Sequence, residues 1–76
     1  MDIKVVFGNV LKELRAEKGV SQERLALEAE LDRSYVSALE RGIYQPSITK
    51  LFDIARVLGV RPGEIIDRVE EGLGKE

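Results

Sequence analysis

The side chains best suited to bind another molecule by hydrogen bonds lie in the middle of the chain, in the sequence Arg-Ser-Tyr-Val-Ser that begins at Arg33. The planar guanidinium of Arg33 carries paired N–H donors that fit the O6 and N7 acceptors on the edge of a guanine base. The short hydroxyls of Ser34 and Ser37 allow close approach to a base or to a phosphate oxygen. The alternative is that Arg33 pairs with Asp32 or Glu30 in water and that both serines are neutral surface residues. The pattern favours recognition of a nucleic acid.

Two short helices joined by a tight turn would position these donors. The spacing of apolar residues predicts the helices over residues 21–29 and 32–41. Their ends are marked by two capping side chains and by a glycine that tolerates left-handed backbone, namely Ser21, Asp32 and Gly42. On the second helix, Val36 and Leu39 fall on one side and the donors fall elsewhere around it. A short helix supported from behind, with donors in front, has the shape that enters the major groove of DNA.

The order of motifs along the chain resembles that of a known family. Ser-Gln-x-x-Leu-Ala is followed by Ser-x-Val-Ser-x-Leu-Glu-x-Gly, then by Pro46 and an apolar segment that ends in Leu-Gly-Val. Over roughly residues 5–66 this pattern is similar to the helix-turn-helix domain of phage repressor and Cro proteins, the XRE family. Within it, the run Asp-Arg-Ser-Tyr-Val-Ser resembles the small controller proteins of restriction-modification systems. The resemblance implies a bacterial or phage-encoded protein that works in the cytoplasm and binds double-stranded DNA.

The whole chain is predicted to form one all-α domain, a compact bundle of five helices over residues 1–76 with no strand. The helices are expected at about 3–18, 21–29, 32–41, 47–58 and 62–71. In the fourth helix, Ile48 is expected to face the core together with the apolar residues that follow it at helical spacing. The fifth helix carries Pro62 in its first turn, and the residues from Gly72 onward are expected to fray.

The composition argues against an enzyme, a metal site or a membrane protein. The chain of 76 residues has no cysteine and no histidine, so it lacks disulfides, thiolate ligands, the usual general base near neutral pH and the commonest zinc ligand. Its carboxylates are spread over helix surfaces, and no glycine-rich loop of the kind that cradles phosphates occurs. It has no signal-peptide pattern and no apolar run of about 18 residues. We therefore expect a cytoplasmic protein with no cofactor, no metal and no membrane partner.

The charge distribution is compatible with a nucleic-acid partner although the net charge is −2. Residues 1–61 carry ten Lys and Arg against nine Asp and Glu, whereas residues 62–76 carry two against five. Between Arg33 and Lys50, three residues are basic and only Glu40 is acidic. The local field at the groove-facing surface matters more than the sum of all charges. The acidic C-terminal part is expected to weaken non-specific binding.

Residues around the second short helix are expected to reach the DNA backbone. The amide of Gln22 lies at the positive end of a helix dipole, which favours a phosphate, and the resemblance also implies a backbone contact here; the alternative is a polar residue without a partner. Tyr35 lies at the edge of the core by its spacing, whereas the resemblance implies a DNA contact. The predicted backbone contacts are Ser21, Gln22, Arg24, Arg41, Tyr44, Gln45 and Lys50. The predicted base contacts are Arg33, Ser34, Tyr35 and Ser37.

The resemblance assigns a structural role to two further charged residues. In the resembled domain, the residue that matches Arg15 on the first helix pairs with the residue that matches Glu40 at the end of the third. Loss of either partner would strand a partly buried charge. We expect this ion pair to fix the angle of the helix that carries Arg33.

A homodimer interface is expected on the fourth and fifth helices. Some apolar residues of these helices are partly available for self-association, and the predicted interface consists of Phe52, Ile65, Ile66 and Val69. A two-fold dimer would place two recognition helices about 34 Å apart, which is one turn of DNA. The alternative is that some of these residues only complete the core of one copy.

These features together predict a sequence-specific transcription regulator that binds an inverted-repeat operator as a homodimer. It would exclude RNA polymerase or recruit it, depending on where the operator lies. No small-molecule effector is implied, so control would come from protein concentration through the dimerisation equilibrium, as the resemblance to controller proteins also implies. The alternative is an antitoxin-like protein-interaction module that also binds DNA, although the short acidic segment after Val69 disfavours a large interface.

Overall fold

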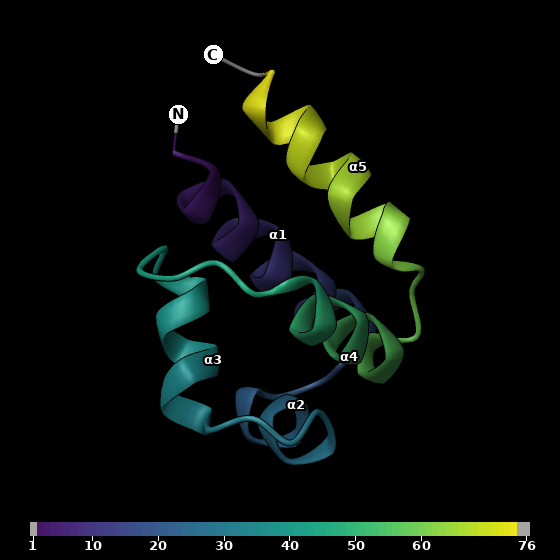
Figure 1. The fold of residues 1–76 in the computed structure, drawn as a ribbon. Coiled ribbons are helices and arrows are strands. Elements are labelled where there is room, and N and C mark those ends of the chain that lie inside the picture. Colours follow the sequence, from purple (N-terminus) through teal and green to yellow (C-terminus); the bar gives the residue numbers. More distant parts are fainter. Residues whose placement is uncertain (1, 75–76) are drawn as a thin grey trace.

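Five helices make up the fold, and the computed structural model describes residues 2–74 (Figure 1). The helices are α1 (Ile3–Lys18), α2 (Gln22–Glu28), α3 (Arg33–Glu40), α4 (Ile48–Leu58) and α5 (Pro62–Leu73). Helices α3, α4 and α5 pack against α1, and α2 packs against α3 and α4. No strand occurs within residues 2–74, so the predicted all-α bundle of five helices is confirmed. The ends of the predicted domain, Met1, Lys75 and Glu76, lie outside the described residues.

Most helix ends follow the capping pattern of the sequence. The hydroxyls of Ser21 and Ser47 each accept a hydrogen bond from the backbone N–H three residues on, at 3.0 and 3.2 Å. Gly42, with φ of 76°, takes the left-handed conformation directly after α3. The predicted capping bond of Asp32 is wrong, because its carboxylate accepts none. The backbone carbonyl of Asp32 instead accepts the first hydrogen bonds of α3, from the N–H groups of Tyr35 at 3.0 Å and of Val36 at 3.1 Å.

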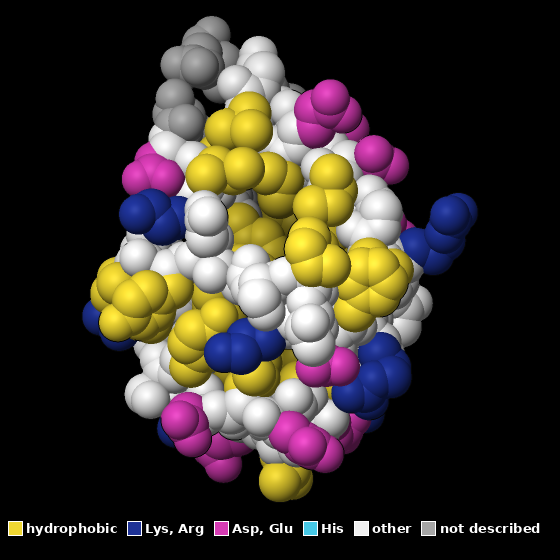
Figure 2. Space-filling model, viewed as in Figure 1, with side chains coloured by type: hydrophobic (Ala, Val, Ile, Leu, Met, Phe, Trp, Pro, Cys, Tyr) yellow, Lys and Arg dark blue, Asp and Glu magenta, His cyan; other side chains and the backbone are white. Residues whose placement is uncertain are grey.

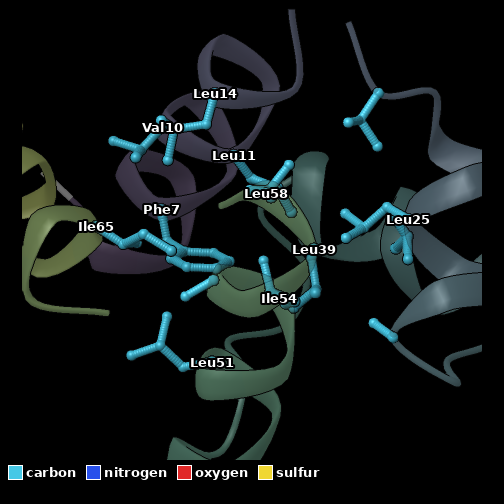
Figure 3. Packing of buried hydrophobic residues seen from close by; sticks show 14 of the residues in the cluster. Phe7, Val10, Leu11, Leu14, Leu25, Leu39, Leu51, Ile54, Leu58 and Ile65 are labelled. Atoms are coloured by element: carbon cyan, nitrogen blue, oxygen red, sulfur yellow. The ribbon is translucent and has the colours of Figure 1, made fainter. Parts of the chain in front are cut away.

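The core lies where the apolar sides of all five helices meet. Figure 3 shows side chains of α1, α3, α4 and α5 converging on one centre, with Leu25 of α2 at its edge. The largest fully buried side chains are Leu11, Leu14, Leu25, Val36, Leu39, Ile54 and Ile65. Because α3 contributes Val36 and Leu39 to this cluster, its buried side is fixed by contacts with the rest of the bundle.

A close backbone contact sets the position of α3 on α1. A Cβ atom added at Gly8 would lie 2.6 Å from the carbonyl oxygens of both Leu39 and Glu40. A Cβ atom at Gly42 would lie 3.0 Å from a methyl carbon of Val5. Glycine at these two places therefore lets the C-terminal end of α3 lie directly against the first turns of α1.

Two expectations about the C-terminal half are wrong. Ile48 is 70% exposed, because it is the first residue of α4 and borders an open hollow, whereas Leu51 and Ile54 further along the helix are buried. The predicted end of the fifth helix at residue 71, with fraying from Gly72 onward, is also wrong, since α5 continues to Leu73; Lys75 and Glu76 lie outside the described residues. A Cβ atom at Gly72 would lie 2.6 Å from a methyl carbon of Val6, so the end of α5 is in close contact with α1.

Candidate nucleic-acid interface

Helix α3 has one face in the core and one face open to solvent. Val36 and Leu39 are fully buried, whereas Arg33, Ser34 and Arg41 are exposed. Ser37 lies on the same outer side and is half-buried. We call Arg33, Ser34 and Ser37 of α3, together with Arg41 directly after it, the exposed face of α3. The predicted orientation of the helix is therefore confirmed.

The C-terminal end of α3 is tied to α1 and α2 by the carboxylate of Glu40. Its Oε1 accepts hydrogen bonds from Nη2 of Arg15 and from Nε2 of Gln22, both at 2.9 Å, and its Oε2 accepts one from Nε of Arg15. Nη1 of Arg15 also donates to the carbonyl oxygen of Val20 at 2.9 Å. The predicted ion pair is thus confirmed, and it extends to a third helix.

The surroundings of Glu40 keep it charged. Burial raises the energy of the charged form, but the hydrogen bonds from Arg15 and Gln22, together with the positive charges of Arg15 and Lys12, outweigh burial and lower the pKa of this carboxyl from its usual value. The charge is satisfied inside the protein, so Glu40 adds little repulsion toward a phosphate near α3.

Gln22 has a partner that the sequence did not reveal. Its amide points to Glu40 across 18 positions of the chain, so the alternative of a polar residue without a partner is wrong. One amide hydrogen is occupied by this bond and the other stays available. A phosphate contact from the second hydrogen, or from the backbone N–H groups at the start of α2, stays a prediction.

Arg33 and Arg24 each form an ion pair with an exposed carboxylate of α2. Arg33 lies 3.7 Å from a carboxylate oxygen of Glu23 on α2, with both side chains mostly exposed, so the sequence alternatives of Asp32 or Glu30 as its partner are wrong. Arg24 donates to Glu28 one turn further along α2, at 2.8 Å. Exposed pairs of this kind contribute little to stability, so either guanidinium can exchange its carboxylate for another acceptor at low cost.

Tyr35, Tyr44 and Lys50 form a cluster beside the exposed face of α3. The rings of Tyr35 and Tyr44 stack with centroids 6.1 Å apart and an angle of 23° between their planes. Nζ of Lys50 lies 4.3 Å from the centroid of the Tyr35 ring, a cation–π geometry. Tyr35 packs partly against the core, and burial raises the pKa of its phenol. We call these three residues the tyrosine–lysine cluster.

The remaining predicted DNA contacts surround α3 without forming one closed site. The Ser21 hydroxyl is used as a helix cap, whereas Arg41, Tyr44 and Gln45 are exposed just beyond α3. Their contacts with DNA stay predictions. These side chains are spread over exposed surface, and such an arrangement suits an extended partner better than an enclosed small ligand.

The predicted dimer residues divide into two groups. Phe52 and Ile66 are 57% and 50% exposed. Ile65 is 1% exposed, so its placement in an interface is wrong, because its side chain fills the core of one copy. Val69 is also buried, but it lies in the wall of a hollow of about 200 Å³, which we call the α4–α5 hollow and which is lined by Ile3, Phe7, Gln45, Pro46, Ile48, Leu51, Ile66 and Val69. In Figure 2 hydrophobic side chains surround a hollow on the upper half of the visible face.

The described residues contain neither a group of metal ligands nor a membrane-spanning helix. Within residues 2–74, no group of three or more acidic side chains is placed to hold a metal ion. In the same range, no helix is both long enough and apolar enough to cross a membrane.

The fold and the exposed face of α3 define the helix-turn-helix class. The family described as "Helix-turn-helix" matches residues 11–65, and the chain belongs to this family. Among its relatives is the control protein C.MunI of Mycoplasma sp, which is 42% identical over 71 residues that cover 92% of this chain and 96% of the relative.

Solved structures agree with this assignment. The restriction-modification controller protein C.AhdI from Aeromonas hydrophila is 45% identical with a TM-score of 0.78, covering 82% of this chain and 94% of that one. The controller protein C.Esp1396I, solved as a tetramer in complex with its natural 35 base-pair operator, is 31% identical with a TM-score of 0.86, covering 99% of both chains.

Proposed function

We propose that this protein is a dimeric, sequence-specific transcription regulator that binds double-stranded DNA through α3. The observation that carries the proposal is the exposed face of α3, which presents a guanidinium and hydroxyls outward while Val36 and Leu39 anchor the helix in the core. In the major groove, the guanidinium of Arg33 can bind guanine O6 and N7 at once. Ser34 and Ser37 are short donors at the same surface.

Backbone contacts would come from the elements on both sides of α3. The first N–H groups of α2 and the amide of Gln22 are suited to one phosphate. Arg41 and Lys50 supply positive charge on the other side, just after α3 and in the first turn of α4. Phosphate contacts of this kind set the register of the protein on the duplex, while base contacts choose the sequence.

The second copy of the chain would join at the α4–α5 hollow. Its rim carries exposed Ile3, Ile48 and Ile66, and Phe52 lies on the same helix as Ile48. Association of two copies would remove these side chains from water, which favours the dimer. The relative C.Esp1396I forms a tetramer on its operator, which supports the proposal that this chain also associates with itself.

Such a dimer would control transcription through the position of its operator relative to a promoter. A bound dimer either blocks RNA polymerase or recruits it, according to the position of the operator. The relatives that are control proteins and restriction-modification controller proteins support a role as such a controller. It would act in the bacterial cytoplasm.

Selection of bound duplexes from a random library tests the proposal. We expect an inverted repeat whose half-sites are one helical turn apart, or about 10 base pairs from centre to centre. The selected duplex should bind more weakly as salt rises. Recovery of no preferred sequence, even at low salt, would refute the function.

A further inference from the structure

A second hollow lies between α3 and the segment that follows it. It has a volume of about 390 Å³ and is lined by Ser34, Tyr35, Ala38, Arg41, Ile43 and Tyr44. We call it the α3–loop hollow. The methyl group of Ala38 is buried, and the side chains of Ile43 and Tyr44 are about half exposed. The inner lining is therefore mostly apolar.

The wall of this hollow is held in place within the protein. The backbone N–H of Ile43 donates to the carbonyl oxygen of Ala38 at 3.0 Å. Tyr44 stacks on Tyr35, and Lys50 lies over the Tyr35 ring. A wall that is ordered before binding loses little entropy when a ligand arrives.

The polar residues of the hollow lie at its rim. Ser34 and Arg41 belong to the exposed face of α3 and are both exposed, so the hollow opens onto the surface that meets DNA under the proposed function. A ligand that suits this lining carries an apolar group beside hydrogen-bond acceptors and negative charge, and the group can be as small as a methyl because the hollow is open to solvent. On the major-groove edge of DNA, the apolar group is the 5-methyl of thymine.

We propose that the α3–loop hollow receives the 5-methyl group of one thymine in each half-site of the bound duplex. This inference rests on the proposed function and adds the identity of a base to it. The contact discriminates a thymine from cytosine without any hydrogen bond to the base. Tyr44 acts here as a specificity-determining residue through its ring rather than through its hydroxyl.

Replacing thymine by deoxyuridine tests the contact, because uracil lacks only the methyl group. Each thymine of the selected duplex is replaced in turn, and affinity is measured with the full chain. We expect a loss of about fourfold per half-site at one position, the value of one buried methyl group. Thymines elsewhere in the duplex should tolerate the replacement.

Two variants at one position locate the effect in the hollow. Tyr44→Ala removes the wall, so it should bind the thymine and uracil duplexes equally. Tyr44→Phe keeps the ring and should retain the fourfold difference. A variant that only destabilised the fold would lower the affinities for the thymine duplex and for the uracil duplex alike, and the fourfold ratio between them would stay unchanged.

Three results would overturn the inference. Sequence-specific binding with no sensitive thymine would refute it and leave the proposed function standing. Persistence of the thymine preference in Tyr44→Ala would place the methyl contact outside this hollow. Absence of sequence-specific binding would refute both proposals.

Discussion

Arg15 of α1 and Glu40 of α3 are joined side chain to side chain across 25 positions of the chain, with Nη2 of Arg15 2.9 Å from Oε1 of Glu40. Glu40 is the one charged residue of the described range 2–74 that is buried, at 5% exposure. It is also the last residue of α3. The pair therefore fixes the C-terminal end of the helix that presents Arg33, Ser34 and Ser37 outward, and its first role is structural.

Glu40→Ala is expected to destabilise the fold by about 3–5 kcal/mol, because it leaves the Arg15 guanidinium without its partner in a partly buried position. Urea unfolding followed by circular dichroism measures the loss. The matched control is Glu28→Ala, which removes an exposed pair with Arg24 and should cost about 0.3–0.5 kcal/mol. Equal losses for the two variants would contradict a structural role for Glu40.

Glu40 also makes stability depend on acid pH. Its folded pKa is lowered by the hydrogen bonds from Arg15 and Gln22, so the unfolded chain binds its proton more readily. The stabilisation is complete above the unfolded pKa of glutamate, about 4.3, and is lost as the pH falls through the lower folded pKa. Unfolding measured from pH 7 to pH 3 should show a steeper fall for the natural chain than for Glu40→Gln. Parallel curves would show that another carboxyl governs this window.

Gly8 is expected to tolerate no side chain. In Gly8→Ala the new methyl group would meet two backbone carbonyls of α3 at 2.6 Å, and neither can move without shifting the helix. Overpacking of this kind costs about 1–3 kcal/mol. The control is Gly63→Ala, also inside a helix, where a Cβ atom meets nothing within 4 Å. Thermal unfolding should show a large loss of stability for Gly8→Ala and none for Gly63→Ala. Similar unfolding curves for the two variants would mean that α3 does not need this close contact.

The sequence predicted the elements better than it predicted the contacts between them. The boundaries of α1 and α4 were predictable because capping residues and apolar spacing act within a few residues. The bond from Gln22 to Glu40 and the stack of Tyr35 on Tyr44 join residues of different elements, to which the period of a single helix does not apply. They arise from the placement of whole helices and of the loop between α3 and α4, which local patterns do not specify.

The burial of individual apolar residues was also not predictable from local patterns, as Ile48 and Ile65 show. Both are apolar and fit the helical spacing of their elements, yet Ile48 is exposed and Ile65 is buried. Spacing identifies the apolar side of a helix, but coverage of each residue depends on how far the neighbouring helix extends. The pair of Arg15 and Glu40 was anticipated through the resemblance to a known family and not through spacing.

Two variants should separate base recognition from phosphate binding. Arg33→Ala is expected to lose about 1–3 kcal/mol of discrimination at one base pair per half-site, since its guanidinium is assigned to a guanine. Lys50→Gln should weaken binding to all duplexes by a similar factor. It should also reduce the slope of log K against log salt concentration by about one. Titration of the selected duplex and of single-base variants at several salt concentrations measures both effects. An unchanged base preference in Arg33→Ala would show that another residue makes this contact.

Ile66→Lys is expected to abolish self-association without unfolding the single copy. Ile66 is 50% exposed and lies at the rim of the α4–α5 hollow, so a charge there stays solvated in one copy but would be buried without a partner between two. Sedimentation should show a monomer, with the unfolding curve nearly unchanged. The control Leu27→Lys changes a residue that is 80% exposed on α2, outside the hollow, and should remain dimeric.

The same variant connects assembly to DNA binding. Two linked copies gain affinity because the second half-site is bound within one complex, by a factor of about 10²–10⁴. Ile66→Lys should therefore bind an inverted repeat only about as tightly as a single half-site, whereas its α3 still recognises the same bases. If Ile66→Lys stays dimeric and binds the inverted repeat as tightly as the natural chain, the two copies meet on another surface. The two α3 helices would then need a different arrangement on the DNA.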